Sequence, residues 1–159
     1  MRTARHCTKV QWLQSGAGPT LKAVQQPRSL IAILDDEEEF RRALTRLLTA
    51  HGYDVITFNR GEELLSAIRD RRFDCVLLDL HMPGMTGFEV LAALRVMDAT
   101  PPVIVITAHD DPECARRALA LDAFDYQMKP VASPVLLGAI ERSCARWREF
   151  PRGTPRSQR

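Results

Sequence analysis

The stretch from Val76 to Gly87 constrains the fold of this chain more than any other part of the sequence. An apolar run ends there at one carboxylate, Asp79, and a loop with one proline and two glycines follows. Such a run, bounded by turn residues, predicts a buried strand that stops at the carboxylate. Asp79 is therefore expected at the carboxyl end of a strand, the edge of an open α/β sheet where sites are built.

Short apolar runs alternate with helical patterns along most of the chain. Strands are predicted over residues 30–34, 53–58, 73–79, 103–107 and 123–129, with one helix after each. Four of these strands are continuously apolar, as strands are when both faces of a sheet are covered. The pattern predicts one domain over residues 29–147, built on a doubly wound, five-stranded parallel sheet of the flavodoxin-like kind.

Apolar residues at helical spacing predict which face of each helix is buried, and capping residues predict where a helix begins. The first helix has five apolar residues at helical spacing: Phe40, Ala43, Leu44, Leu47 and Leu48. The fourth is expected to begin at Asp111-Pro112 and to bury a stripe of four residues: Cys114, Ala115, Ala118 and Leu119. The fifth is expected to be capped by Ser133-Pro134 and to turn four residues inward: Leu137, Ile140, Cys144 and Trp147.

Composition limits the classes of protein to which the chain can belong. No apolar stretch approaches the roughly 20 residues that a membrane-spanning helix needs, and the N-terminus lacks the apolar core of a secretion signal. No C-x-x-C spacing occurs, so reduced thiols in a cytoplasmic protein are expected for all four cysteines: Cys7, Cys75, Cys114 and Cys144.

Charge is distributed unevenly along the chain. Residues 30–145 hold 12 basic and 19 acidic residues, whereas residues 1–29 hold five basic residues and no acid. The last 14 residues hold five arginines and one glutamate. We expect residues 1–28 and 148–159 to be basic, disordered extensions, and the absence of interleaved aromatic residues disfavours nucleic-acid binding by either.

Polar residues stand at the carboxyl ends of four different predicted strands: Asp35-Asp36, Asp79, Thr107 and Lys129. In a parallel sheet these ends share one edge, so the four positions should converge on one pocket. Asp35-Asp36 taken alone would serve equally well as helix-capping acids, and Thr107 alone as an ordinary β-branched residue at a strand end.

Three carboxylates in one pocket repel each other unless a cation lies among them. A site made of oxygen ligands suits Mg²⁺. Lys129 is the one lysine between residues 30 and 145, and its compact ammonium can neutralise a phosphoryl oxygen as a point charge. The sequence therefore predicts a magnesium site with a basic counter-charge.

These residues together resemble the receiver domain of two-component response regulators. The resemblance covers about residues 29–147, and the segment from Leu77 to Gly87 is close to the most characteristic one of that family. The matching positions are in register with the predicted strand ends: Asp35-Asp36, Asp79, Thr107, Lys129-Pro130, and Tyr126 three residues before Lys129.

The resemblance implies a role for each matching position. Asp79 would be phosphorylated by a partner histidine kinase or histidine phosphotransfer protein. Asp36 and Asp79, with the backbone carbonyl of His81, would ligate Mg²⁺ directly, and Asp35 would act through water. Lys129 would pair with the phosphoryl group, and a cis peptide is expected before Pro130. Thr107 and Tyr126 would form a switch pair.

A phosphorylation-switched binding module is the function that follows, without enzymatic activity beyond phosphotransfer to Asp79 and its reversal. The switched surface would comprise the helix around 114–119, the strand 123–128 and the last helix, and could also support a homodimer. The chain is expected to be a stand-alone receiver, because 12 residues after Trp147 cannot hold an output domain. His81 and His109, two residues beyond Asp79 and Thr107, are expected to influence dephosphorylation.

Two other functions stay open on the residues alone. A relay intermediate would pass its phosphoryl group to a histidine phosphotransfer protein. A hydrolase of small phosphoesters is disfavoured, because His81 stands where a second acid-base aspartate would be needed. DNA binding through the basic ends would require steep salt dependence.

Overall fold

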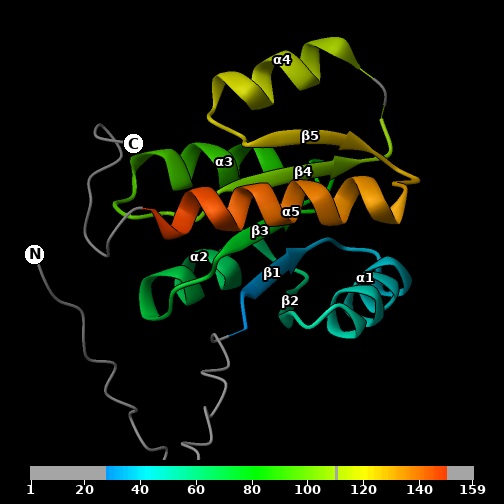
Figure 1. Ribbon diagram of the computed structural model, residues 1–159. Helices are drawn as coiled ribbons and strands as arrows, with labels where there is room; N and C mark the ends of the chain where they lie inside the picture. Colours follow the sequence, from blue (N-terminus) through cyan, green and yellow to red (C-terminus); the bar gives the residue numbers. More distant parts are fainter. Residues whose placement is uncertain (1–27, 110, 150–159) are drawn as a thin grey trace, which may run out of the picture.

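A computed structural model describes residues 28–109 and 111–149 (Figure 1). Five strands alternate with five helices in these residues: β1 (Leu30–Leu34), α1 (Glu38–Ala50), β2 (Asp54–Phe58), α2 (Gly61–Asp70), β3 (Cys75–Leu78), α3 (Gly87–Val96), β4 (Val103–Thr107), α4 (Pro112–Ala120), β5 (Asp125–Met128) and α5 (Ser133–Arg148). The strands form one parallel sheet in the order β2-β1-β3-β4-β5. The predicted flavodoxin-like, doubly wound architecture is confirmed.

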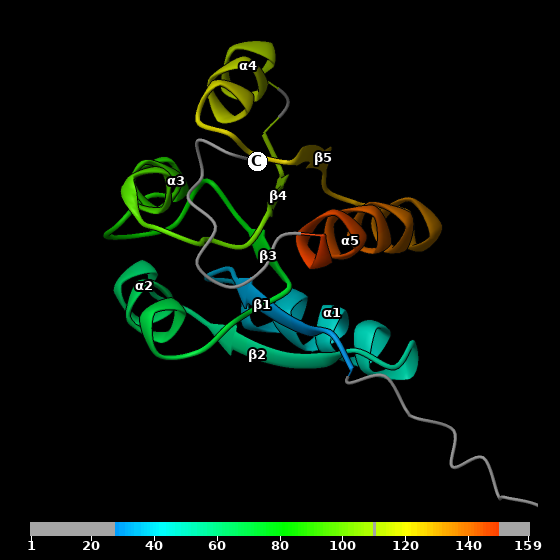
Figure 2. The same cartoon turned by 60° about the vertical axis from the view of Figure 1, so that its left-hand side comes forward.

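The helices cover the sheet on both faces (Figure 2). α1 and α5 lie on one face, and α2, α3 and α4 lie on the other. Alternate residues of the inner strands enter opposite cores, so that Ile104 packs on the α1–α5 side and Val105 on the other. All four residues of β3 are buried, because this central strand is covered from both sides. The predicted run over 73–79 is thus longer than the strand, which ends one residue before Asp79.

Helix starts follow the capping chemistry of the sequence in two cases and depart from it in one. Thr86 and Glu89 form a reciprocal capping box at the start of α3. The Asp111 side chain accepts a hydrogen bond from the Glu113 N–H and caps α4 as predicted. Ser133 is not the cap of α5: it is the first helical residue, and Ala132 precedes it without a side-chain cap. Pro134 at the start of the helix is pre-organised for helical backbone, which lessens the need for one.

Two predicted helix faces are narrower than expected. In α1, Leu44 and Leu48 are buried and Phe40 and Leu47 are half-buried, but Ala43 is exposed. In α4, Ala118 is buried, whereas Leu119 is 51% exposed. β5 is one of the two edge strands of the sheet, so α4 lies at the margin of the sheet and its apolar stripe is only partly covered.

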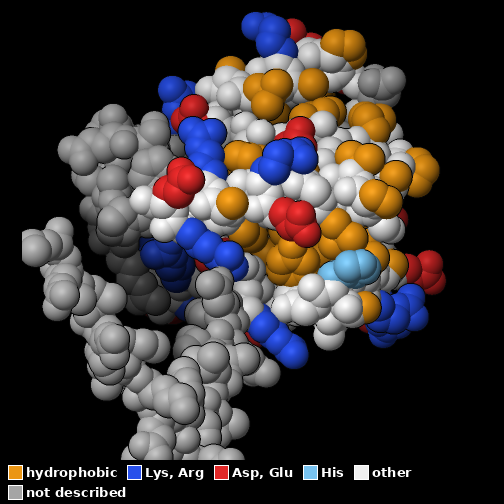
Figure 3. All heavy atoms as spheres, viewed as in Figure 1, with side chains coloured by type: hydrophobic (Ala, Val, Ile, Leu, Met, Phe, Trp, Pro, Cys, Tyr) orange, Lys and Arg blue, Asp and Glu red, His pale blue; other side chains and the backbone are white. Residues whose placement is uncertain are grey.

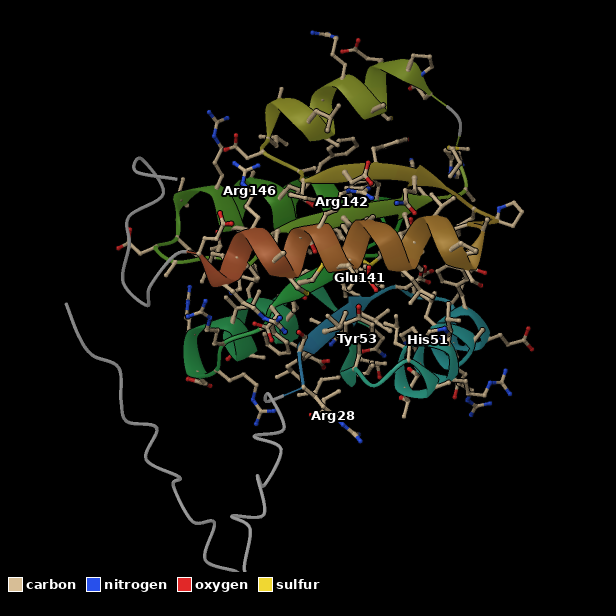
Figure 4. The ribbon with its side chains drawn as sticks, in the orientation of Figure 1. Arg28, His51, Tyr53, Glu141, Arg142 and Arg146 are labelled. Atoms are coloured by element: carbon tan, nitrogen blue, oxygen red, sulfur yellow. The ribbon has the colours of Figure 1, made fainter. Side chains whose placement is uncertain are left out.

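The C-terminal helix is tied to the rest of the domain at its last turn. Arg72 lies over the Trp147 ring at 4.9 Å and donates a hydrogen bond to the Trp147 carbonyl. Arg148 donates to Ser29 Oγ at 2.6 Å. Figure 4 shows Glu141, Arg142 and Arg146 along the outward side of this helix. α5 therefore ends at Arg148, one residue beyond the predicted domain boundary at 147.

Several expectations concern the ends of the chain and the cysteines. The predicted extensions fall almost wholly on residues 1–27 and 150–159, outside the described residues, as does Cys7. Cys75 and Cys144 are buried free thiols, and burial raises the pKa of both. Cys114 is a half-buried free thiol. Within the described residues, no helix combines the length and apolar character that crossing a bilayer requires.

Candidate functional site

Four side chains predicted to converge do so at the carboxyl edge of the sheet. Asp35 follows β1, Asp79 follows β3, Thr107 ends β4, and Lys129 follows β5. Asp35 and Asp79 are 2% and 5% exposed, and Thr107 is fully buried. Ionisable groups buried to this extent need partners, so their contacts define the chemistry of the site.

Lys129 supplies the counter-charge of the pocket. Its Nζ lies 2.8 Å from Asp35 Oδ2 and 3.4 Å from Asp79 Oδ2. Two further contacts were not foreseen from the sequence: Glu37 Oε1 at 3.0 Å and the Phe40 ring at 4.1 Å. Burial opposes the charge of this ammonium, yet its pKa is raised because the surrounding carboxylates stabilise the protonated form.

The carboxylates of Asp35, Asp36 and Asp79 form the acidic cluster that the sequence predicted. Each offers an oxygen, and these atoms lie within 4.8 Å of one another. Asp36 is exposed while the other two are buried, so the cluster opens to solvent on one side. Oxygen donors at this spacing, with one face open for water, fit a hard divalent cation such as Mg²⁺.

Asp35 is fixed by its own local turn. Its Oδ1 accepts a hydrogen bond from the Glu37 N–H at 2.8 Å, and its carbonyl accepts one from Arg41 Nη1 at 2.6 Å. Burial raises the pKa of the Asp35 carboxyl, and the hydrogen bonds from Lys129 and the Glu37 N–H offset part of that rise. Asp35 therefore depends on neighbouring positive charge to stay ionised.

Two histidines enclose the hydroxyl of Thr107. His81 Nδ1 lies 3.2 Å from Thr107 Oγ1, and the His109 N–H donates to the same oxygen at 3.4 Å. The two imidazole rings lie 4.0 Å apart between centroids, tilted by 35°. The backbone N–H of His81 also donates a hydrogen bond to Asp79 Oδ1 at 3.3 Å. The histidines flagged by the sequence thus connect Asp79 with Thr107.

Tyr126 lies beside this group without entering the pocket. Its half-buried ring packs on the α4 side of the sheet, and its hydroxyl donates to the His109 carbonyl at 3.2 Å. The Lys129 N–H donates to the Thr107 carbonyl at 2.8 Å, and the Lys129–Pro130 peptide is cis, as expected. Thr107 and Tyr126 are therefore connected indirectly, because both hydrogen-bond to the backbone of His109 in the loop after β4.

Gly87 is a residue of the site whose role the sequence did not reveal. A Cβ atom at this position would collide with the Asp79 carbonyl oxygen and would lie 2.7 Å from Leu80 Cα. The start of α3 therefore packs directly on the backbone that carries Asp79, and the Gly87 N–H donates to the Leu80 carbonyl at 3.0 Å. The signal in the sequence was a glycine directly after the N-cap residue Thr86, where a tight approach replaces a side chain.

The sequence of this chain is similar to a known protein family and to several curated proteins. Residues 31–141 match the family described as the response regulator receiver domain. The sensory/regulatory protein RpfC of Xanthomonas campestris is 36% identical over 129 residues, which are 78% of this chain and 18% of that protein. The DNA-binding transcriptional regulator NtrC of Klebsiella pneumoniae is 35% identical over 130 residues, 80% of this chain and 28% of that protein. The chain thus spans less than a third of these curated relatives.

Solved structures show the same fold. FixJ-N superposes with a TM-score of 0.71 at 35% identity, covering 76% of this chain and 96% of that one. The chemotaxis protein CheY4 of Vibrio cholerae superposes with a TM-score of 0.66 at 29% identity, covering 73% of this chain and 98% of that one. Each match covers almost the whole of a compact receiver structure.

Proposed function

The chain belongs to the response regulator receiver domain family, and on that premise we propose that it is a signalling switch whose phosphoacceptor is Asp79. The observation that carries the proposal is the contact between the buried Asp79 carboxylate and Lys129, inside a cluster of three carboxylates. A carboxylate in this position can act as a nucleophile, and an ammonium beside it can meet the charge of the incoming group.

Phosphotransfer would proceed by in-line attack of an Asp79 carboxylate oxygen on the phosphorus of a partner's phosphohistidine. The new P–O bond forms an acyl phosphate, and the P–N bond breaks with its electron pair returning to the imidazole, which takes up a proton. Lys129 now contacts three carboxylates and would transfer one of these contacts to a phosphoryl oxygen. Mg²⁺ held by Asp36, Asp79 and the His81 carbonyl, with Asp35 acting through water, would offset the remaining negative charge.

The switch would begin at the Thr107 hydroxyl. Donating its O–H to a phosphoryl oxygen would end any donation from this hydroxyl to His81 Nδ1, and moving toward that oxygen would draw Oγ1 away from the His109 N–H. His109 also accepts the hydrogen bond of the Tyr126 hydroxyl, so movement of the loop after Thr107 releases Tyr126. Phosphorylation would in this way alter the surface of α4, β5 and α5, which we propose as the partner-binding surface.

Hydrogen exchange in the presence of beryllofluoride, a stable mimic of the phosphoryl group, tests this switch. With Mg²⁺ and beryllofluoride, peptides from α4, β5 and α5 should change their exchange rates while peptides from α2 do not. Thr107→Val keeps the shape of the side chain and removes the hydroxyl, and should abolish the change. An unaltered α4–β5–α5 surface in the loaded wild-type protein would refute the switch.

The neighbouring rings of His81 and His109 lie where they could control loss of the phosphoryl group. Hydrolysis needs a water to attack phosphorus with departure of the Asp79 carboxylate. The His81 backbone N–H contacts that carboxylate, the His81 ring contacts Thr107, and the His109 ring lies against the His81 ring. We propose that the two rings order or block this water. His81→Ala and His109→Ala should each change the decay rate of phospho-Asp79 several-fold, and unchanged decay in both would end the idea.

We propose that the chemistry of the chain is confined to phosphotransfer onto Asp79 and hydrolysis of the acyl phosphate. Its donors would be a histidine kinase or a histidine phosphotransfer protein, in keeping with the family. A donor test with a phosphorylated histidine protein, followed over time, also measures return transfer. Rapid return of the group to histidine would favour a relay over a switch.

A further inference from the structure

A groove runs along the outer edge of the domain between α1 and β2. Its volume is about 500 Å³, and residues of both elements line it: Glu38, Arg41, Arg42, Thr45, Arg46, Val55 and Thr57. None of these residues belongs to the cluster around Asp79, and β2, the strand that forms one wall, is the edge strand opposite β5. Arg41 links the groove to the phosphoacceptor site: it lines the groove, and its guanidinium donates a hydrogen bond to the Asp35 carbonyl.

The backbone of β2 offers unused hydrogen-bonding groups along this groove. Asp54 donates its N–H to Ser29, and Phe58 accepts from the Asp35 N–H, so these residues direct their backbone groups toward β1 and its flanks. Because direction alternates along a strand, the N–H and C=O groups of Val55 and Thr57 point away from the sheet. The side chains of the same two residues line the groove. An edge of this kind can pair with another extended segment.

The charge of the groove is opposite to that of the domain around it. Three arginines and one glutamate line it, whereas residues 30–145 as a whole carry more acids than bases. Arg42 pairs with Glu38 at 2.5 Å, and no described acid is paired with Arg46. Figure 3 shows basic side chains standing over α1 at the lower right of the molecule.

We propose that this groove binds an acidic segment of a partner protein, which pairs as an extended strand with the free edge of β2. Carboxylates on alternate residues of that strand would meet Arg42 and Arg46, and the residues between them would face the side of Ile56 and Phe58. Main-chain hydrogen bonds to Val55 and Thr57 would supply affinity, and the arginines specificity. A second copy fits less well, because pairing of two β2 strands brings two basic grooves together.

A labelled peptide of alternating glutamate and valine residues tests the proposal by fluorescence anisotropy on the full chain. Arg42→Glu combined with Arg46→Glu should weaken its binding by about tenfold or more, because two favourable charge contacts become repulsive. Arg69→Glu combined with Arg71→Glu makes the same change in net charge at the C-terminal end of α2 and should leave binding unchanged. Equal loss in both double variants, or in neither, overturns the acidic-peptide assignment.

The strand geometry has its own test. One peptide is N-methylated at every glutamate and another at every valine, and only one set of amides can face β2 in an extended strand. One of the two peptides should therefore lose binding while the other retains it; retention or loss by both contradicts strand pairing. Thr57→Pro, which removes an outward N–H at an edge position, should also abolish binding, while Thr57→Val retains it. Binding of a short DNA duplex as tightly as the acidic peptide would overturn the proposal.

Discussion

At the scale of single residues, the site is a balance of charge around Lys129. Its ammonium contacts Asp35, Glu37 and Asp79, and burial makes each uncompensated charge costly. The sequence predicted that Lys129 would meet Asp79, because both follow parallel strands. It did not predict Glu37 or Phe40 as contacts, because strand-end positions do not determine which nearby side chains a flexible lysine will reach.

Lys129→Met removes the positive charge from this cluster and should destabilise the fold. In metal-free protein near neutral pH we expect a loss of about 3 kcal/mol in the free energy of unfolding, the scale for breaking a buried ion pair. The pKa of Lys129 is raised on folding, so its contribution is complete below about pH 10.5 and is lost as pH rises through the folded value. The difference between wild type and variant, measured by urea unfolding, should shrink above that pH. A difference that stays constant into alkali would contradict the account.

Gly87→Ala should damage the domain by a steric route. The added methyl group has to displace the backbone of Asp79 and Leu80, and overpacking of this kind costs about 1–3 kcal/mol. Gly138→Ala is the matched control, because its added Cβ meets just the end of the flexible Arg142 side chain, at 3.4 Å. Thermal unfolding should show a clearly lower melting temperature for Gly87→Ala and no decrease for Gly138→Ala. Equal melting temperatures for Gly87→Ala and wild type would refute the close approach.

At the scale of elements, α4 is the least firmly packed helix. One of its residues, Ala118, is fully buried, whereas six residues of α5 are buried. The periodicity of the sequence predicted both helices but could not show that α4 would lie at the margin of the sheet and leave Leu119 exposed. Helical spacing identifies a potential apolar face, and the width of the surface beneath it decides how much of that face is covered. α4 also belongs to the surface that we propose changes on phosphorylation.

Hydrogen exchange of the unphosphorylated protein tests this weakness. Amides of α4 should exchange faster than those of α5 by at least about tenfold, because opening α4 exposes less buried surface. Peptide-resolved mass spectrometry gives both rates in one sample, which serves as its own control. Equal protection of the two helices would show that α4 is held by contacts beyond Ala118.

At the scale of the whole molecule, the sheet order brings residues distant in sequence to one edge. β1 and β3 are neighbours, and so are β4 and β5, which places Asp35 beside Asp79 and Thr107 beside Lys129. The alternation of strands and helices was enough to predict this convergence. The switch geometry was not predictable, because the contacts of Thr107 with two histidines depend on loop conformations that no periodic pattern encodes.

Binding of Mg²⁺ should stabilise the whole domain through the acidic cluster. At a free ion concentration about ten times the dissociation constant, the expected gain is about 1.4 kcal/mol, or a rise of a few degrees in melting temperature. Asp36→Asn removes the exposed member of the cluster and should greatly reduce this gain, whereas Glu141→Gln on α5 should preserve it. Chelator should reverse the rise in wild type. An equal rise in Asp36→Asn would place the ion elsewhere.

The central claim is that Asp79 accepts the phosphoryl group, and intact mass spectrometry after incubation with acetyl phosphate and Mg²⁺ tests it most directly. Wild type should gain the mass of one phosphoryl group, and Asp79→Asn, which lacks the nucleophilic carboxylate, should gain none. A phosphoryl adduct on both proteins, or on neither, would contradict the account.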